Sequence, residues 1–250
     1  MSKTTTALIT HPDGLLHQTP GKVHEQVARL DFVLRAIEDL PLERHPAPLA
    51  RRDQIEALHA PAYVDRVLTG APESGYAILD PDTDGETALS PTSLNAVLRA
   101  VGGATLAVDL VLSGQATNGF VAMRPPGHHA LPDAAMGFCF FGNVALAAHH
   151  AMTAHGLDRV AIVDFDVHHG NGTQALLWDE PRALVVTSQQ MPLWPGTGAA
   201  DECGAHDNIL NIPLAPGTGG DEMRQIYAEQ VFPRLRAFNP QLLLISAGFD

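Results

Sequence analysis

The sequence predicts an α/β fold with a mostly parallel central sheet and helices on both faces. Short aliphatic and β-branched runs alternate with longer stretches of helical spacing, which is the pattern of strand–helix–strand units. The 250 residues fit one large domain, and a hydrophobic content of 45% supports a sizeable core. No linker interrupts the pattern, so we expect a single domain over residues 1–250.

Six short apolar runs predict the buried strands of this sheet. Each is rich in Ala, Val, Ile or Leu and ends at a Gly, Pro or polar cluster, as expected of a strand covered on both faces. The runs are 7–10, 119–123, 160–165, 183–188, 208–212 and 241–246.

Three longer segments predict helices, at 91–113, 143–155 and 221–238. We expect Gly102 and Gly103 to interrupt the first, Gly156 to end the second and Pro233 to kink the third. The polar segments 43–52 and 80–86 are predicted to be loops.

Charge and composition narrow the functional classes. Fifteen basic residues against 28 acidic ones give a net charge of −13, which argues against a simple basic nucleic-acid binder and suits a cationic or neutral substrate. Cys139 and Cys203 are too few for a disulfide framework and favour a reducing compartment, the cytoplasm. No signal peptide is visible, and no apolar stretch approaches about 20 residues, so we expect no membrane contact.

The densest polar segment, 163–172, follows a predicted strand. Asp164, Asp166 and His168 alternate with apolar residues, so their side chains can share one side of an extended chain. Ligand sites lie at the carboxyl ends of parallel strands, and an Asp-x-His pair offers oxygen and nitrogen to Zn²⁺. The alternative is an acidic loop with a solvated histidine.

A second polar cluster, 124–130, also follows a predicted strand. Two prolines and a glycine make a stiff, tight turn that carries His128 and His129, an arrangement suited to general acid–base catalysis. Each ring needs an orienting partner, and Asp164 and Asn171 are candidates. The alternative is a pair of loop histidines without partners.

The remaining candidates carry less chemistry. His149 and His150 are neighbours on a predicted helix and diverge by about 100°, so we interpret them as surface or packing residues. The aromatics of 136–143 form either core or a wall beside the site, with Trp194 as the facing wall. Cys139 is interpreted as a packed thiol rather than a nucleophile.

Five motifs resemble the zinc-dependent histone deacetylase family, which includes bacterial deacetylase-like proteins and acetylpolyamine amidohydrolases. They are RPPGHH at 124–129, GFCFFGN at 137–143, DFDVHHGNG at 164–172, PGTG at 195–198 and SAGFD at 246–250. The resemblance implies an arginase-like fold with one catalytic Zn²⁺.

The resemblance also implies roles for individual residues. Asp166 and His168 match two metal ligands, and His128 and His129 match the tandem histidines that handle water and the leaving amine. Asp164 matches the partner of the first histidine. Asn171 matches the partner of the second, where class I enzymes have an aspartate and class II and bacterial members resemble this chain.

Further matches concern the substrate channel and a second ion. Phe138 and Trp194, with Gly137 beside them, match the lining of the acyl-lysine channel. Asp164 and Ser188 match contributors to a structural monovalent-cation site, usually K⁺.

The sequence also departs from the family pattern. The third zinc ligand is expected beyond Asp250, as is the transition-state tyrosine, so we expect the domain to be truncated at its C-terminal end. Residues 21–25 differ from the usual Gly-His-Pro-Glu, which leaves substrate preference open.

The implied function is zinc-dependent removal of acetyl or other acyl groups from acetyl-lysine or acetylated polyamines. The alternatives are a non-catalytic binding module of the same family and a ureohydrolase of the same fold with two Mn²⁺. We expect an acetylated amine as the partner, without direct nucleic-acid contact; whether the chain forms a homo-oligomer stays open.

Overall fold

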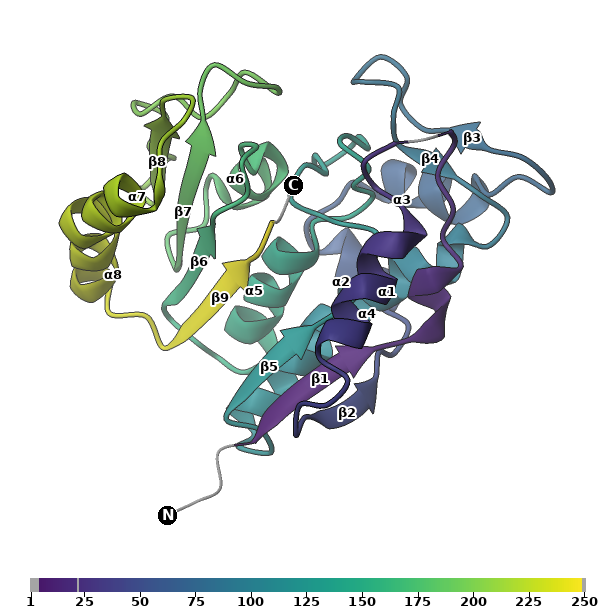
Figure 1. Cartoon of the computed structure of the whole chain (residues 1–250), viewed down its shortest axis with the longest axis horizontal. Helices are drawn as coiled ribbons and strands as arrows, with labels where there is room; N and C mark the ends of the chain where they lie inside the picture. The colour runs from purple at the N-terminus through teal and green to yellow at the C-terminus, as the bar shows by residue number, and fades with distance from the viewer. Residues whose placement is uncertain (1–4, 22, 249–250) are drawn as a thin grey trace.

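The computed structural model describes residues 5–21 and 23–248 and arranges them around two parallel sheets (Figure 1). The first has the order β2-β1-β5 and the second the order β8-β7-β6-β9. A short antiparallel pair, β3-β4, lies apart from both. The strands are β1 (Thr6–Thr10), β2 (Glu43–Pro46), β3 (Ala77–Ile78), β4 (Ala88–Leu89), β5 (Asn118–Val121), β6 (Val160–Asp164), β7 (Ala183–Gln190), β8 (Ile209–Leu214) and β9 (Leu242–Ser246).

Helices surround the sheets. The α-helices are α1 (Val27–Ala36), α2 (Arg52–Glu56), α3 (Pro61–Thr69), α4 (Ser93–Leu112), α5 (Asn143–Ala154), α6 (Asn171–Leu177), α7 (Gly220–Ile226) and α8 (Phe232–Phe238). A 3₁₀ turn at Pro12–Leu15 follows β1, and a π-helical turn at Tyr227–Val231 joins α7 to α8.

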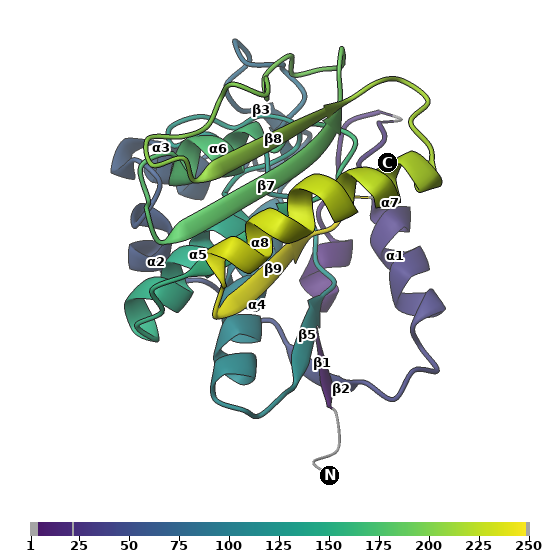
Figure 2. The same cartoon turned by 90° about the vertical axis from the view of Figure 1, so that its left-hand side faces the viewer.

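The four-stranded sheet is covered on both faces. Val160 and Ile162 of β6 pack with α5, whereas Ala161 and Val163 pack with the α7–α8 segment. Figure 2 shows α7 and α8 lying across this second face. Because successive strand residues point to opposite faces, the continuous apolar runs that predicted these strands match burial on both sides. The predicted α/β class is confirmed.

All six predicted strands are present, and their ends differ from the predicted ends by at most two residues. One predicted loop is wrong. Residues 43–46 form β2, which pairs in parallel with β1 at the edge of the first sheet. Its side chains are mostly exposed, so it lacks the apolar signal that marked the other strands.

The expected break in α4 is also wrong, because both glycines have a packing role. A side chain at Gly102 would overlap the carbonyl of Pro48, and one at Gly103 would crowd Ala47 and Ile9. The glycines let an unbroken helix lie directly against the chain that follows β2.

The continuous α4 corrects the expectation about apolar stretches. Among the described residues it is the one helix long and apolar enough to cross a membrane by length and composition, and half of its apolar window is buried inside the protein. Core helices of soluble proteins meet the same criteria, so this is weak evidence for a membrane span.

Candidate active site

The tandem histidines and their predicted partners come together. The Nδ1–H of His128 donates to Oδ2 of Asp164 at 3.0 Å, and the Nδ1–H of His129 donates to Oδ1 of Asn171 at 2.7 Å. The two rings lie 3.9 Å apart between centroids. Since both acceptors are oxygens, each Nδ1 carries a proton, and a neutral ring then bears its lone pair on Nε2.

Local packing fixes this arrangement. Asp164 ends β6 and is fully buried, while Asn171 begins α6. A side chain at Gly172 would overlap the backbone of His129, and the Thr173 N–H donates to the His128 carbonyl at 3.0 Å. The start of α6 is therefore locked onto the histidine loop.

The partner of His128 is a carboxylate, whereas the partner of His129 is an amide. The pKa of His129 reflects its surroundings. Burial first, and then the neighbouring His128, holds the pKa of His129 well below its usual value, although the bond to Asn171 opposes this shift. His129 is only 4% exposed and is neutral at neutral pH.

Asp166 and His168 lie side by side at the end of β6. Oδ1 of Asp166 is 3.3 Å from Nδ1 of His168 and accepts the His168 backbone N–H at 2.7 Å. Burial alone would raise the pKa of Asp166, but the His168 hydrogen bonds and the charge of His128 lower it overall. An ionised carboxylate this buried calls for a compensating cation, and paired oxygen and nitrogen donors suit a zinc-class ion.

The chain that follows β9 approaches Asp166 closely. A side chain at Gly248 would overlap the Asp166 carboxylate, so only glycine allows this approach. Residues 249 and 250, the end of the SAGFD motif, lie outside the described residues.

One aromatic side chain, Trp194, borders the histidines. The Trp194 ring lies 4.7 Å from His129 and 5.9 Å from His168 between centroids, and Trp194 is 40% exposed. Gly137 (φ +57°) sits against both His129 and Trp194, where any side chain would collide. Phe138 follows with the left-handed φ of +62°, which is costly for a non-glycine residue and is found at functional sites.

The acidic loop 80–86 holds this turn in place, a role that its sequence did not indicate. Oδ2 of Asp84 accepts the Gly137 N–H at 2.5 Å, and Oδ2 of Asp80 accepts the Ala135 N–H at 2.8 Å. Cys139 is fully buried, and burial raises its thiol pKa, which matches the interpretation as a packed residue.

Ser188, which the resemblance groups with Asp164, lies beside it. Its Oγ is 3.4 Å from the Asp164 carbonyl oxygen and 2.8 Å from the Tyr227 hydroxyl, and both Ser188 and Asp164 are buried. The structure brings these oxygens together, and a bound K⁺ stays a prediction.

A buried ion pair anchors the start of the histidine loop. Arg124 pairs through two nitrogens with the Glu25 carboxylate and donates to the carbonyls of Gly14 and His17, each at 3.1 Å. The two charges are 99 residues apart in sequence, so no spacing rule could have paired them.

His59, for which the sequence alone indicated no role, joins the two ends of the segment 131–142, which lies between the tandem histidines and α5. Its Nδ1–H donates to the Leu131 carbonyl and its Nε2 accepts the Gly142 N–H, both at 3.0 Å. Burial lowers the pKa of His59 to about 4, which keeps the ring in this neutral form.

The pattern of motifs matches a known family model. The histone deacetylase domain model matches residues 23–250. The chain belongs to the histone deacetylase family. This confirms the resemblance and, at the level of the family, the prediction of a deacetylase-type amide hydrolase.

Known family members resemble the chain over most of its length. An uncharacterised protein, slr0245, of Synechocystis is 42% identical over 98% of this chain and 81% of its own length. A histone deacetylase-like amidohydrolase of Pseudomonas aeruginosa is 38% identical over 84% of the chain and 55% of its own length. Human polyamine deacetylase HDAC10 is 34% identical over 98% of the chain, which spans 39% of that protein.

A solved structure confirms the family fold. The crystal structure of the HDA15 HD domain superposes with a TM-score of 0.90 at 31% identity, covering 98% of this chain and 74% of that one. The arginase-like deacetylase fold predicted from the motifs is therefore confirmed.

The histone deacetylase motifs also border a cavity. A space of about 670 Å³ opens beside Asn171, on the side where its amide Nδ2 contacts the Met136 sulfur at 3.4 Å. Its lining residues are Leu131, Met136, Asn171, Gln174, Ala175, Trp178, Pro195 and Thr197.

Proposed function

We propose that the chain is a zinc-dependent amidohydrolase that removes acetyl groups from acetylated amines, either acetyl-lysine or acetylated polyamines. The observation that carries the proposal is the unequal histidine pair: His128 on the carboxylate of Asp164, and His129 on the amide of Asn171, beside the donors of Asp166 and His168.

Asp166 and His168 would hold the metal, together with a third ligand outside the described residues. A zinc-class ion, when bound, polarises an amide carbonyl and acidifies water. Two donors on one rigid strand end fit that ion, and the buried carboxylate supplies charge for it.

The histidine pair supplies the proton transfers. His129 is neutral, and its Nδ1–H is held by Asn171, so Nε2 is the atom that takes a proton from the attacking water. The same nitrogen can return that proton to the departing amine nitrogen. Asp164 fixes the orientation of His128, whose ring lies against that of His129.

Substrate class follows from the walls and the charge. The Trp194 ring offers a flat apolar surface suited to the methylene stem of an alkylamine, and the resemblance implies the same role for Phe138. The acidic net charge is compatible with a cationic or neutral substrate, and the names of human HDAC10 and the Pseudomonas relative support acetylated amines.

The decisive experiment combines metal analysis with turnover. The zinc-loaded chain is assayed on an acetyl-lysine reporter and an acetylated diamine. His129→Ala should lower kcat by about 10²–10⁴-fold with zinc content unchanged, because it removes a proton acceptor but no ligand. His149→Gln, at a helix position away from the site, is the matched control. Intact turnover in His129→Ala would overturn the assignment, whereas two Mn²⁺ per chain that are both lost in His168→Gln would favour the ureohydrolase.

Asn171→Asp tests the partner of His129 directly. A carboxylate would favour the imidazolium and raise the pKa of His129, so the acidic limb of the kcat/KM profile should move to higher pH. An unchanged profile would show that His129 is not the proton acceptor.

A further inference from the structure

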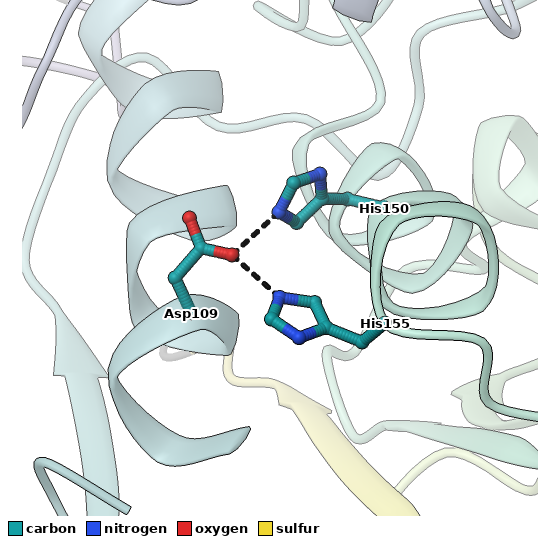
Figure 3. Close-up of side chains that lie close together, drawn as sticks. All are labelled: Asp109, His150 and His155. Carbon is teal, nitrogen blue, oxygen red and sulfur yellow. Dashed lines mark hydrogen bonds and ion pairs between the residues drawn. The ribbon is translucent and has the colours of Figure 1, made fainter. Parts of the chain in front are cut away.

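A second cluster of metal-binding side chains lies outside the proposed active site. Asp109 on α4 faces His150 and His155 at the end of α5 (Figure 3). Oδ1 of Asp109 is 2.7 Å from Nε2 of both rings, and the three ligand atoms lie within 4.8 Å of one another. No sequence pattern indicates this cluster, because Asp109 is 41 residues from His150 and 46 from His155.

The end of α5 explains why the two imidazoles converge. Five residues along an ideal helix rotate the side chain by about 140°, so His150 and His155 would diverge. The helix ends at Ala154, His155 is its C-cap and Gly156 turns with φ +69°, so the second ring swings back beside the first. Their ring planes are nearly perpendicular, at 81°, with both Nε2 atoms aimed at the carboxylate.

The local field favours a cation. Asp109 lies in the last turn of α4 and His155 caps α5, so the negative ends of two helix dipoles meet here. Burial acts to raise the pKa of Asp109, but the two histidines lower it by more than burial raises it, so the carboxylate is ionised. The side chains of Asp109, His150 and His155 are 47%, 19% and 26% exposed, which leaves the ligands accessible from solvent.

We propose that Asp109, His150 and His155 form a second divalent-metal site, which takes a zinc-class ion and links α4 to α5. Two imidazoles and one carboxylate are the donor set of borderline divalent ions, and water would complete the coordination. Each ring needs only to move its proton from Nε2 to Nδ1 to present a lone pair. The site goes beyond the proposed function, because it includes none of the residues assigned to that reaction.

Zinc stoichiometry tests the site in the full chain. Equilibrium dialysis at pH 7.5 with metal analysis should show that Asp109→Asn and His155→Gln each bind one Zn²⁺ per chain fewer than the unmodified protein. His149→Gln, the adjacent histidine beside Glu180 and Arg182, should retain it. The ion should persist in His168→Gln, so loss of the proposed active-site metal and loss of this one are separable.

Thermal unfolding gives a second measurement. At a hundredfold excess of Zn²⁺ over its dissociation constant, the His168→Gln protein should gain roughly 5–10 °C in Tm. The Asp109→Asn/His168→Gln protein should gain nothing. The proposal is wrong if the Asp109 and His155 variants bind as much Zn²⁺ as the unmodified chain, or if no bound Zn²⁺ depends on these residues.

Discussion

The two histidine clusters have similar hydrogen bonds but opposite environments. At the proposed active site, His129 has one amide oxygen at 2.7 Å, and its surroundings are closed by Trp194 and Gly137. At the α4–α5 cluster, one carboxylate oxygen serves two imidazoles at the same 2.7 Å, and all three side chains reach solvent.

Burial decides what such a contact can do. The enclosed ring has its pKa lowered and its tautomer fixed, so it is prepared for one proton transfer. The α4–α5 cluster is open to solvent, so its surroundings do not prepare either ring for a proton transfer. A bound cation would give these three side chains a function. A short hydrogen bond to histidine is therefore no sign of catalysis without the surrounding packing.

The largest effect on stability is expected from the buried ion pair behind the histidine loop. Glu25→Gln leaves the Arg124 guanidinium buried without its counter-charge and should lower the free energy of unfolding by about 3–5 kcal/mol. Urea unfolding measures this. The control is Asp31→Asn, which breaks the exposed Asp31–Arg35 pair and should cost less than about 0.5 kcal/mol. Equal losses of unfolding free energy in the two variants would show that burial does not determine how much an ion pair contributes.

The next effect is acid sensitivity from two enclosed histidines. Burial lowers the pKa of His17 to about 3 and that of His59 to about 4, against 6.5 in the unfolded chain. Their contribution to stability is complete above pH 6.5 and is lost as the pH falls toward these values, because only the unfolded chain takes up the protons. Lowering the pH from 7.5 to 5.0 should therefore reduce the free energy of unfolding by about 2 kcal/mol for each histidine.

Urea midpoints at the two pH values measure this loss. His59→Gln should remove its share of the pH dependence and leave that of His17. A free energy of unfolding that stays constant between pH 7.5 and 5.0 would contradict the buried, neutral assignment of both rings.

The sequence predicted what depends on local order. The strands β6 and β7 follow from unbroken apolar runs, and the i, i+2 spacing placed Asp164 and Asp166 at one strand end. Asn171 and Trp194 were already candidates for the surroundings of the histidines, and the resemblance then assigned Asn171 to His129 and Trp194 to the channel wall.

What the sequence could not predict depends on contacts between distant segments. Strand β2 is recognisable only from its pairing with β1, because the exposed edge strand carries no apolar pattern. Glu25 finds Arg124, and Asp109 finds His150, only after the fold is complete. The two side-chain contacts join residues 99 and 41 positions apart, so they depend on helix and strand packing rather than on local preference.

The smallest expected effect concerns the α4–α5 cluster without metal. In the presence of a chelator, Asp109→Asn should change the free energy of unfolding by less than about 1 kcal/mol, since half-exposed ion pairs contribute little and an amide oxygen can still accept a hydrogen bond from His150. Urea unfolding with and without chelator measures both states. A large loss under chelator would mean that the contact is a structural ion pair in its own right. A small loss under chelator that grows when Zn²⁺ is added would show that these three side chains stabilise the protein chiefly through the ion they hold.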